Sequence, residues 1–199
     1  MLIAALATAV LLAVQTTPPP KAPTVGTAPP AAKVNTSTLL AMLGTSLVET
    51  DGKRINTAEA IKDNTIIALY FSAGWCPPCK KFTPKLVEFV KQNENSKAFT
   101  VIFVSSDRSA EEHAKYMKHY KMPFPAMPFD KAQLKQIKQA YGGNGIPNLV
   151  LLNADGTVIK GSYETNGTYS PKNRKSYIGP DPVLAELGKL IKQDVKKTA

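Results

Sequence analysis

Cysteine and histidine are scarce in this sequence of 199 residues, which contains two of each. Cys76 and Cys79 lie three positions apart, so they cannot form the several crosslinks of a disulfide-stabilised scaffold. Structural zinc would need two further ligands, and the two histidines, His113 and His119, lie in a charged helical segment. We expect both histidines to face solvent. The cysteine pair is therefore better suited to catalysis than to a structural role.

Long apolar runs are also missing, since the most apolar stretch covers only Met1 to Val14. A helix that spans a bilayer needs about 20 such residues. The stretch is typical of the apolar part of an export signal, although no Lys or Arg precedes it. We expect residues 1–17 to be a signal peptide or apolar anchor. The predicted location is extracytoplasmic, either periplasmic or secreted, with tethering to a membrane by the N-terminus as an open alternative.

A change in composition separates this stretch from the rest of the chain. Residues 18–33 are rich in proline and alanine, cannot pack a core and are predicted to form a disordered linker. Residues 34–199 have the length and the ordinary apolar content of one folded domain. The domain organisation is thus a leader, a linker and a single domain.

Acidic residues are outnumbered, with 15 Asp and Glu against 25 Lys and Arg. The net charge is +10, and residues 1–33 carry two lysines and no acid, which leaves +8 for the domain. Such a charge could attract nucleic acid or anionic membrane. The basic residues are scattered and no basic-aromatic platform is visible, so we expect a solvated surface and no nucleic-acid binding. We expect a monomer.

The order of the predicted elements indicates an α/β fold. Helices are predicted at 37–43, 77–92, 109–120, 131–141 and 181–196, buried strands at 65–72 and 99–104, and hairpins at 46–55 and 147–160. Crossover helices between long buried strands predict a mixed sheet that is covered by helices on both faces. Residues 122–129 are expected to be an extended loop, and residues 161–179 a polar loop.

Both cysteines fall where a buried strand gives way to a helix. With Cys76 at the N-cap, Pro77 occupies N1, where proline is favoured, and Pro78 and Cys79 follow. The helix dipole and the Cys79 amide would stabilise a thiolate at Cys76 and lower its pKa below the free value of about 8.5. We expect Cys76 to be the exposed attacking thiolate and Cys79 the buried resolving thiol.

Four other residues are expected to support this chemistry. Trp75 would lie beside the Cys76 thiol as a lid and contact surface, and Lys80 adds positive charge. Ile146-Pro147, at a strand entry after a glycine-rich stretch, is a second candidate element of the site. An X-Pro bond of this kind is normally trans.

The chain resembles the thioredoxin-like superfamily, and within it the tryparedoxin and nucleoredoxin branch. The resemblance covers residues 39–160 and is carried by Tyr70–Pro84 with its Trp-Cys-Pro-Pro-Cys core, Phe103–Asp107, Met122–Phe129 and Gly145–Val150. It implies a thioredoxin-like fold with an N-terminal hairpin extension. It also implies dithiol–disulfide exchange at a redox-active Cys76–Cys79 disulfide, without a dissociable cofactor.

The same resemblance assigns further roles. It makes Ile146-Pro147 a cis peptide that faces Cys76, where the backbone of a substrate docks. Tyr70 stands where many thioredoxins carry a buried acid, so another group or water must accept the proton of Cys79.

The leading functional hypothesis is an extracytoplasmic thiol–disulfide oxidoreductase that reduces protein disulfides. Such a protein needs an electron donor, which we expect to be a membrane protein or a thiol. A disulfide oxidant or isomerase is the alternative enzyme, because direction depends on the reduction potential. A non-catalytic binding module with the same fold is the alternative outside enzymes.

Overall fold

The computed structural model describes residues 36–198. The predicted export segment, the linker and the start of the domain at residue 34 therefore lie outside the described residues. Within residues 36–198, no helix has both the length and the apolar character that crossing a membrane requires.

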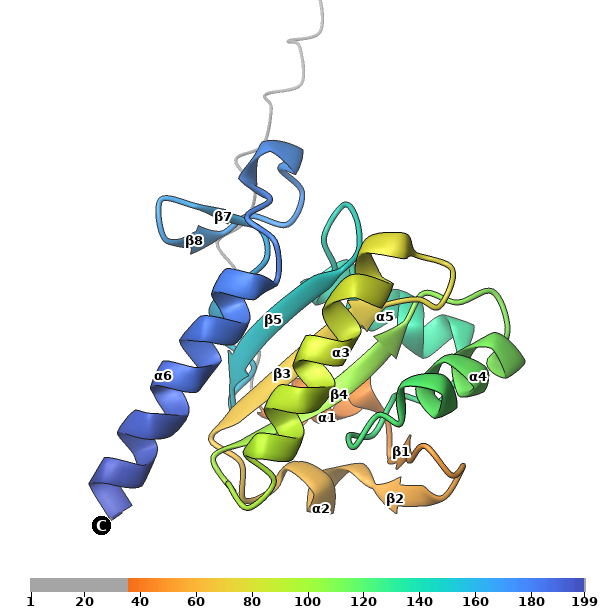
Figure 1. The fold of residues 1–199 in the computed structure, drawn as a ribbon, viewed down its shortest axis with the longest axis horizontal. Coiled ribbons are helices and arrows are strands. Elements are labelled where there is room, and N and C mark those ends of the chain that lie inside the picture. The colour runs from red at the N-terminus through yellow and green to blue at the C-terminus, as the bar shows by residue number, and fades with distance from the viewer. Residues whose placement is uncertain (1–35, 199) are drawn as a thin grey trace, which may run out of the picture. The chain divides into compact units, whose positions relative to one another are not determined.

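A four-stranded mixed sheet forms the centre of the domain, in the order β4-β3-β5-β6 (Figure 1). Its strands are β3 (Ile66–Ser72), β4 (Phe99–Ser105), β5 (Asn148–Asn153) and β6 (Val158–Gly161). β3 pairs in parallel with β4 and antiparallel with β5, and β5 pairs antiparallel with β6. Every residue of β3 is buried, as expected for a central strand covered on both faces.

Helices cover both faces of this sheet (Figure 1). One face packs against α3 (Pro77–Gln92), α4 (Ala110–Tyr120) and α6 (Asp181–Thr198). The other packs against α1 (Thr36–Leu43), α2 (Thr57–Ile61) and α5 (Lys131–Tyr141). The remaining elements are β1 (Ser46–Val48), β2 (Arg54–Asn56), β7 (Glu164–Thr165), β8 (Thr168–Tyr169) and the 3₁₀ helix η1 (Arg174–Ser176).

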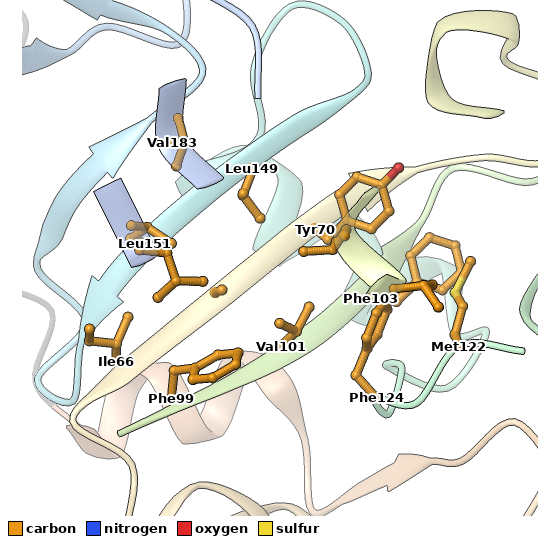
Figure 2. Close-up of a cluster of buried hydrophobic side chains, with 14 of the residues drawn as sticks. Ile66, Tyr70, Phe99, Val101, Phe103, Met122, Phe124, Leu149, Leu151 and Val183 are labelled. Atoms are coloured by element: carbon orange, nitrogen blue, oxygen red, sulfur yellow. The ribbon is translucent and has the colours of Figure 1, made fainter. Parts of the chain in front are cut away.

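Alternate residues of β3 enter two separate cores. Ile66, Ala68 and Tyr70 join the cluster under α3 and α6, together with Val101 and Leu149 (Figure 2). Ile67, Leu69 and Phe71 point the other way, into the cluster under α1 and α5. This period-two burial from a nearly continuous apolar sequence confirms the predicted doubly covered α/β sheet.

The segment between α4 and α5 differs from the prediction of a plain extended loop. Ala126 forms an antiparallel bridge with Val48 of β1 and a parallel bridge with Phe103 of β4. Its backbone N–H donates to Val48 O, and Val48 N–H donates back to Ala126 O, both at 2.8 Å. The segment therefore joins the N-terminal hairpin to the edge of the central sheet.

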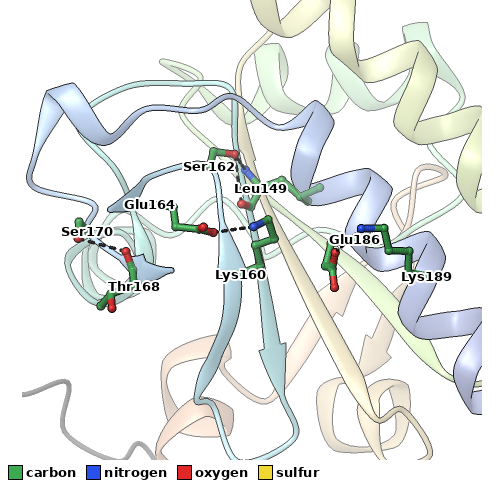
Figure 3. A network of polar contacts seen from close by, with 8 residues as sticks. All are labelled: Leu149, Lys160, Ser162, Glu164, Thr168, Ser170, Glu186 and Lys189. Atoms are coloured by element: carbon green, nitrogen blue, oxygen red, sulfur yellow. Dashed lines mark hydrogen bonds and ion pairs between the residues drawn. The ribbon is translucent and has the colours of Figure 1, made fainter. Parts of the chain in front are cut away.

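Residues 161–179 are more ordered than the predicted polar loop. They contain β7, β8 and η1 and are attached to the sheet by polar contacts (Figure 3). Ser162 Oγ accepts from Leu149 N–H at 2.9 Å, and Lys160 forms a mostly buried 2.7 Å ion pair with Glu164. The prediction missed this order because the Ser162 contact joins residues 13 positions apart, which no short-range pattern connects.

The prediction for the histidines was correct for His119 and wrong for His113. His119 is exposed, whereas His113 is buried against the rings of Phe103 and Phe129. The helical period of α4 turns His113 inward with Tyr116. Burial lowers the pKa of His113, so the side chain is accommodated as a neutral ring.

Candidate active site

The two cysteines occupy the first turn of α3, directly after β3. Cys76 is the N-cap, and its Sγ accepts a hydrogen bond from the Cys79 amide at 3.3 Å. Pro77 and Pro78 follow at the first two helical positions, where a missing N–H costs little. Cys76 and Cys79 are joined in a disulfide. The predicted N-cap arrangement is confirmed, and we call residues 74–79 the cysteine wall.

Exposure of the two sulfurs differs from the expectation. Cys79 is fully buried, as predicted, but Cys76 is also buried, with 3% of its surface exposed. The expectation of an exposed Cys76 was wrong for this disulfide form, because Ala73 and Ile146 pack against the cysteine pair. Cys76 is nevertheless the more accessible of the two.

Residues 143–147 face Cys76 from the other side, and we call them the proline wall. The Ile146–Pro147 peptide bond is cis, as the resemblance implies. The carbonyl oxygen of Ile146 lies 3.7 Å from Cys76 Sγ. The structure thus brings Cys76 and Ile146-Pro147 together, although 70 positions separate them in the chain.

Tyrosines from residues 161–179 hold the proline wall. Tyr177 donates its hydroxyl to Pro147 O at 2.9 Å, and Tyr163 donates to Gly145 O at 3.2 Å. The ring of Tyr163 also lies so close to Gly143 that a Cβ there would come within 2.0 Å of it. Sequence reasoning missed these residues, because a tyrosine in a polar segment gives no sign of its distant partner.

A third tyrosine secures the end of α5, where the proline wall begins. Tyr169 donates its hydroxyl to Tyr141 O and lies 3.3 Å from the amide nitrogen of Asn148. Burial raises the pKa of Tyr169 and raises that of Tyr177 to about 12. Both hydroxyls therefore remain protonated donors at neutral pH.

Trp75 stands at the rim of the site with 48% of its surface exposed. Its indole N–H donates to Ser106 O at 3.0 Å, and the Arg108 guanidinium lies 5.9 Å from the ring centroid. Asp107 accepts from Gly74 N–H and from Ser105 Oγ, each at 2.7 Å. The loop after β4 thus anchors the residues that precede Cys76.

A chain of buried hydroxyl groups lies behind Cys79. Tyr70 is hydrogen-bonded to Thr83 at 2.8 Å, Thr83 to Tyr116, and Tyr116 to Ser72 at 3.0 Å. Thr83 also reaches the carbonyl oxygen of Cys79 at 2.9 Å. Burial raises the pKa of Tyr70 and of Tyr116, so neither can take the Cys79 proton at neutral pH.

Lys80 is exposed and lies with Trp75 in a groove between the start of α3 and α4. Lys80 therefore lies on the same side of the site as the cysteine wall, where the sequence predicts its positive charge. Within residues 36–198, no group of three or more His, Cys, Asp and Glu side chains is placed to hold a metal ion.

Comparisons with known proteins agree with this geometry. A family model described as thioredoxin-like matches residues 64–158. The crystal structure of thioredoxin from Wuchereria bancrofti is 32% identical, with a TM-score of 0.57, and the match covers 74% of this chain and 97% of that one. The chain belongs to the thioredoxin-like family. The predicted fold is thereby confirmed.

Relatives of this thioredoxin-like protein include the two predicted groups. Tryparedoxin from Trypanosoma brucei brucei is 39% identical over 97 residues, which cover 48% of this chain and 66% of that protein. Probable nucleoredoxin 1 from Arabidopsis thaliana is 37% identical over 133 residues, or 64% of this chain. The match spans only 22% of that nucleoredoxin. These oxidoreductase relatives support a redox enzyme in general terms.

Proposed function

We propose that this thioredoxin-like protein reduces protein disulfides, with Cys76 as the attacking residue and Cys79 as the resolving residue. The observation that carries the proposal is the Cys76–Cys79 disulfide at the start of α3, facing Ile146-Pro147. The helix start favours a thiolate at Cys76, and the greater accessibility of Cys76 favours it as the point of attack.

The proposed reaction transfers two electrons to the substrate. The Cys76 thiolate attacks one sulfur of the substrate disulfide, a mixed disulfide forms, and the other substrate sulfur leaves as a thiolate that takes up a proton. The Cys79 thiolate, which has given up its proton to water, then attacks Cys76 Sγ and releases the second substrate thiol. This step leaves the Cys76–Cys79 disulfide, which a thiol donor or a membrane protein must reduce.

Three residues are proposed to hold the substrate. Trp75 offers an exposed ring next to Cys76, and Ile146 and Pro147 offer the backbone of the proline wall. Tyr70, Pro77, Pro78 and Lys80 support the cysteines. No dissociable cofactor is required, because the cysteine pair itself carries the electrons.

Reduction of insulin in the presence of dithiothreitol tests the proposal. The wild-type protein should accelerate insulin precipitation, and Cys76→Ser should lose that acceleration entirely. Full activity of Cys76→Ser, or no activity of the wild type, would refute a reductase. Reactivation of scrambled ribonuclease, or a reduction potential of about −120 mV rather than below about −200 mV, would instead indicate an isomerase or an oxidant.

An extracytoplasmic location belongs to the same proposal and rests on the apolar residues 1–14 alone. Expression of the full chain with a C-terminal tag, followed by fractionation, tests it. The protein should be recovered outside the cytoplasm, and deletion of residues 1–17 should retain it inside. Equal distribution of the two forms would contradict the location without affecting the enzymology.

A further inference from the structure

Four cationic side chains line one groove beside the redox site. Arg108 comes from the loop after β4, and Lys131, Lys135 and Lys138 come from α5. We call this the basic groove, and its volume is about 430 Å³. The three lysines recur at helical spacing and so share one face of α5, and α5 contains no acidic residue. The charges that look scattered in the sequence are gathered here by the fold.

The positive charge of the basic groove is only partly offset by the residues around it. In the part of the chain that the structure describes, none of these four side chains forms an ion pair. The one carboxylate in the lining belongs to Asp107, which is buried and already accepts hydrogen bonds from Gly74 and Ser105. Four cations and one internally bonded acid leave a net charge of +3.

The basic groove continues toward the redox site. Lys138 also lines a second hollow of about 240 Å³, whose other walls include Trp75 and Ile146. Arg108 lies against the Trp75 ring. On the opposite side of Trp75, the groove next to α4 has mixed charge, since Lys80 and Lys115 are accompanied there by Glu112. Asp107 lines both grooves, so the α5 side, with four cations and no other acid, is the more positively charged of the two.

We propose that the basic groove binds an acidic segment of the partner protein whose disulfide faces Cys76. The part concerning the disulfide rests on the proposed function, whereas the binding of an acidic segment does not. Glutamate or aspartate side chains would pair with the lysines of α5, and the half-buried Phe129 supplies apolar surface for the intervening atoms. Charge complementarity of this kind speeds association and selects among partners.

A peptide fits the basic groove better than a nucleic acid does. Through Lys138 the groove adjoins the hollow lined by Trp75 and Ile146, and the proposed function places a polypeptide disulfide there. Its lining contains a single aromatic residue, Phe129, so it lacks the series of rings on which successive bases stack. An acidic partner is therefore the occupant that the lining favours, and a single-stranded oligonucleotide is a competitor to be tested.

Fluorescence of Trp75 provides a test that needs no turnover, because Trp75 is the only tryptophan of the chain. The oxidised protein is titrated with a cysteine-free peptide rich in glutamate, with its glutamine counterpart and with a single-stranded DNA oligonucleotide. The glutamate peptide should bind about tenfold more tightly than the glutamine peptide, the ratio that several exposed ion pairs supply together. About 1 M salt should abolish the difference.

Two triple variants with equal loss of charge complete the test. Lys131→Gln, Lys135→Gln and Lys138→Gln together should remove the tenfold preference. Lys91→Gln, Lys97→Gln and Lys192→Gln, which lie outside the groove, should leave it unchanged. The single change Lys135→Gln, at an exposed position, should give a smaller loss of the same sign if the triple variant folds poorly.

Several outcomes would overturn the proposal. These are equal binding of the two peptides by the wild type, an equal loss in both triple variants, or tighter binding of the oligonucleotide than of the glutamate peptide. Insulin reduction is measured in parallel. A protein that binds the glutamate peptide but reduces no insulin would refute the reductase and retain the groove. A protein that reduces insulin but binds the two peptides equally would refute the acidic-segment proposal and retain the reductase.

Discussion

The cysteine wall and the proline wall are held by different kinds of contact. In the cysteine wall, the decisive hydrogen bond joins Cys76 and Cys79, three positions apart. In the proline wall, Tyr177 reaches Pro147 across 30 positions, and Tyr163 reaches Gly145 across 18. The turn that carries the two cysteines is thus built locally, although Gly74 and Trp75 before it are held by Asp107 and Ser106. The proline wall, where we propose that the substrate docks, depends on a segment beyond residue 158, where the family match ends.

This difference separates chemistry from substrate positioning. A change in residues 161–179 can displace the proline wall and leave the sulfur geometry of the cysteine wall intact. A change at the start of α3 can alter the sulfur geometry and leave the proline wall in place. The two walls can therefore be perturbed one at a time, and each should give its own signature in kinetics and stability.

The largest effect is expected from breaking the cysteine wall. Cys79→Ser removes the resolving thiol, so turnover with insulin should stop after the first attack. The variant should then accumulate mixed disulfides with the substrate, detectable by mass spectrometry of the acid-quenched protein. Cys76→Ser serves as the matched control and should accumulate none. Equal trapping by the two variants would contradict the assigned order of attack.

A smaller but clear effect is expected from overfilling the proline wall. Gly143→Ala places a methyl group within 2.0 Å of the Tyr163 ring. Overpacking of this kind lowers the free energy of unfolding by about 1–3 kcal/mol, which urea denaturation measures. Gly145→Ala is the matched control, since its new Cβ would meet only the Tyr163 hydroxyl oxygen, at 3.3 Å. A larger loss at Gly145 than at Gly143 would refute this view of the wall.

Removal of one hydroxyl from the proline wall should have a modest effect. Tyr177→Phe deletes the hydrogen bond to Pro147 O and should cost about 0.5–1.5 kcal/mol of stability. The KM for a protein disulfide should rise a few-fold, with little change in kcat, because the cysteine wall is untouched. Tyr120→Phe is the control outside both walls, since this hydroxyl makes only a 3.4 Å contact with Lys80 O. A fall in kcat without a change in KM would argue against a positioning role.

The smallest effect is expected in the pH dependence of stability, because 43% of the Tyr177 surface is exposed and solvent weakens the contribution of its titration. Burial raises the pKa of Tyr177 from 10.0 to about 12, so the unfolded chain loses this proton first. The stabilisation is complete below pH 10 and is lost as the pH rises toward 12. Tyr177→Phe should therefore show a shallower alkaline decline in urea-unfolding free energy than the wild type. Parallel curves for the two proteins would contradict the shift.

The local parts of the fold and of the site could be predicted from the sequence. The bounds of α3, the N-cap position of Cys76 and the buried strand β3 all follow from patterns within one or two turns of chain. The cis bond at Ile146-Pro147 required the family resemblance. Such features are set by neighbours in the sequence or by a short motif, and both are visible in one chain.

The remote parts could not be predicted, for a physical reason. The tyrosine contacts, the inward turn of His113 and the covering of Cys76 by Ile146 depend on which elements the sheet brings together. The same holds for the basic groove, which combines α5 with the loop after β4. The type and spacing of side chains do not predict these long-range contacts unless the strand order is already known.

The bridge at Ala126 has a consequence for self-association. β4 is an outer strand of the central sheet, and an outer strand offers unpaired N–H and C=O groups to other chains. At Phe103 both groups are occupied, since the N–H donates to Pro125 O and the carbonyl oxygen accepts from Met127 N–H. The protein thus caps the middle of this edge with its own chain, which blocks a template for edge-to-edge aggregation.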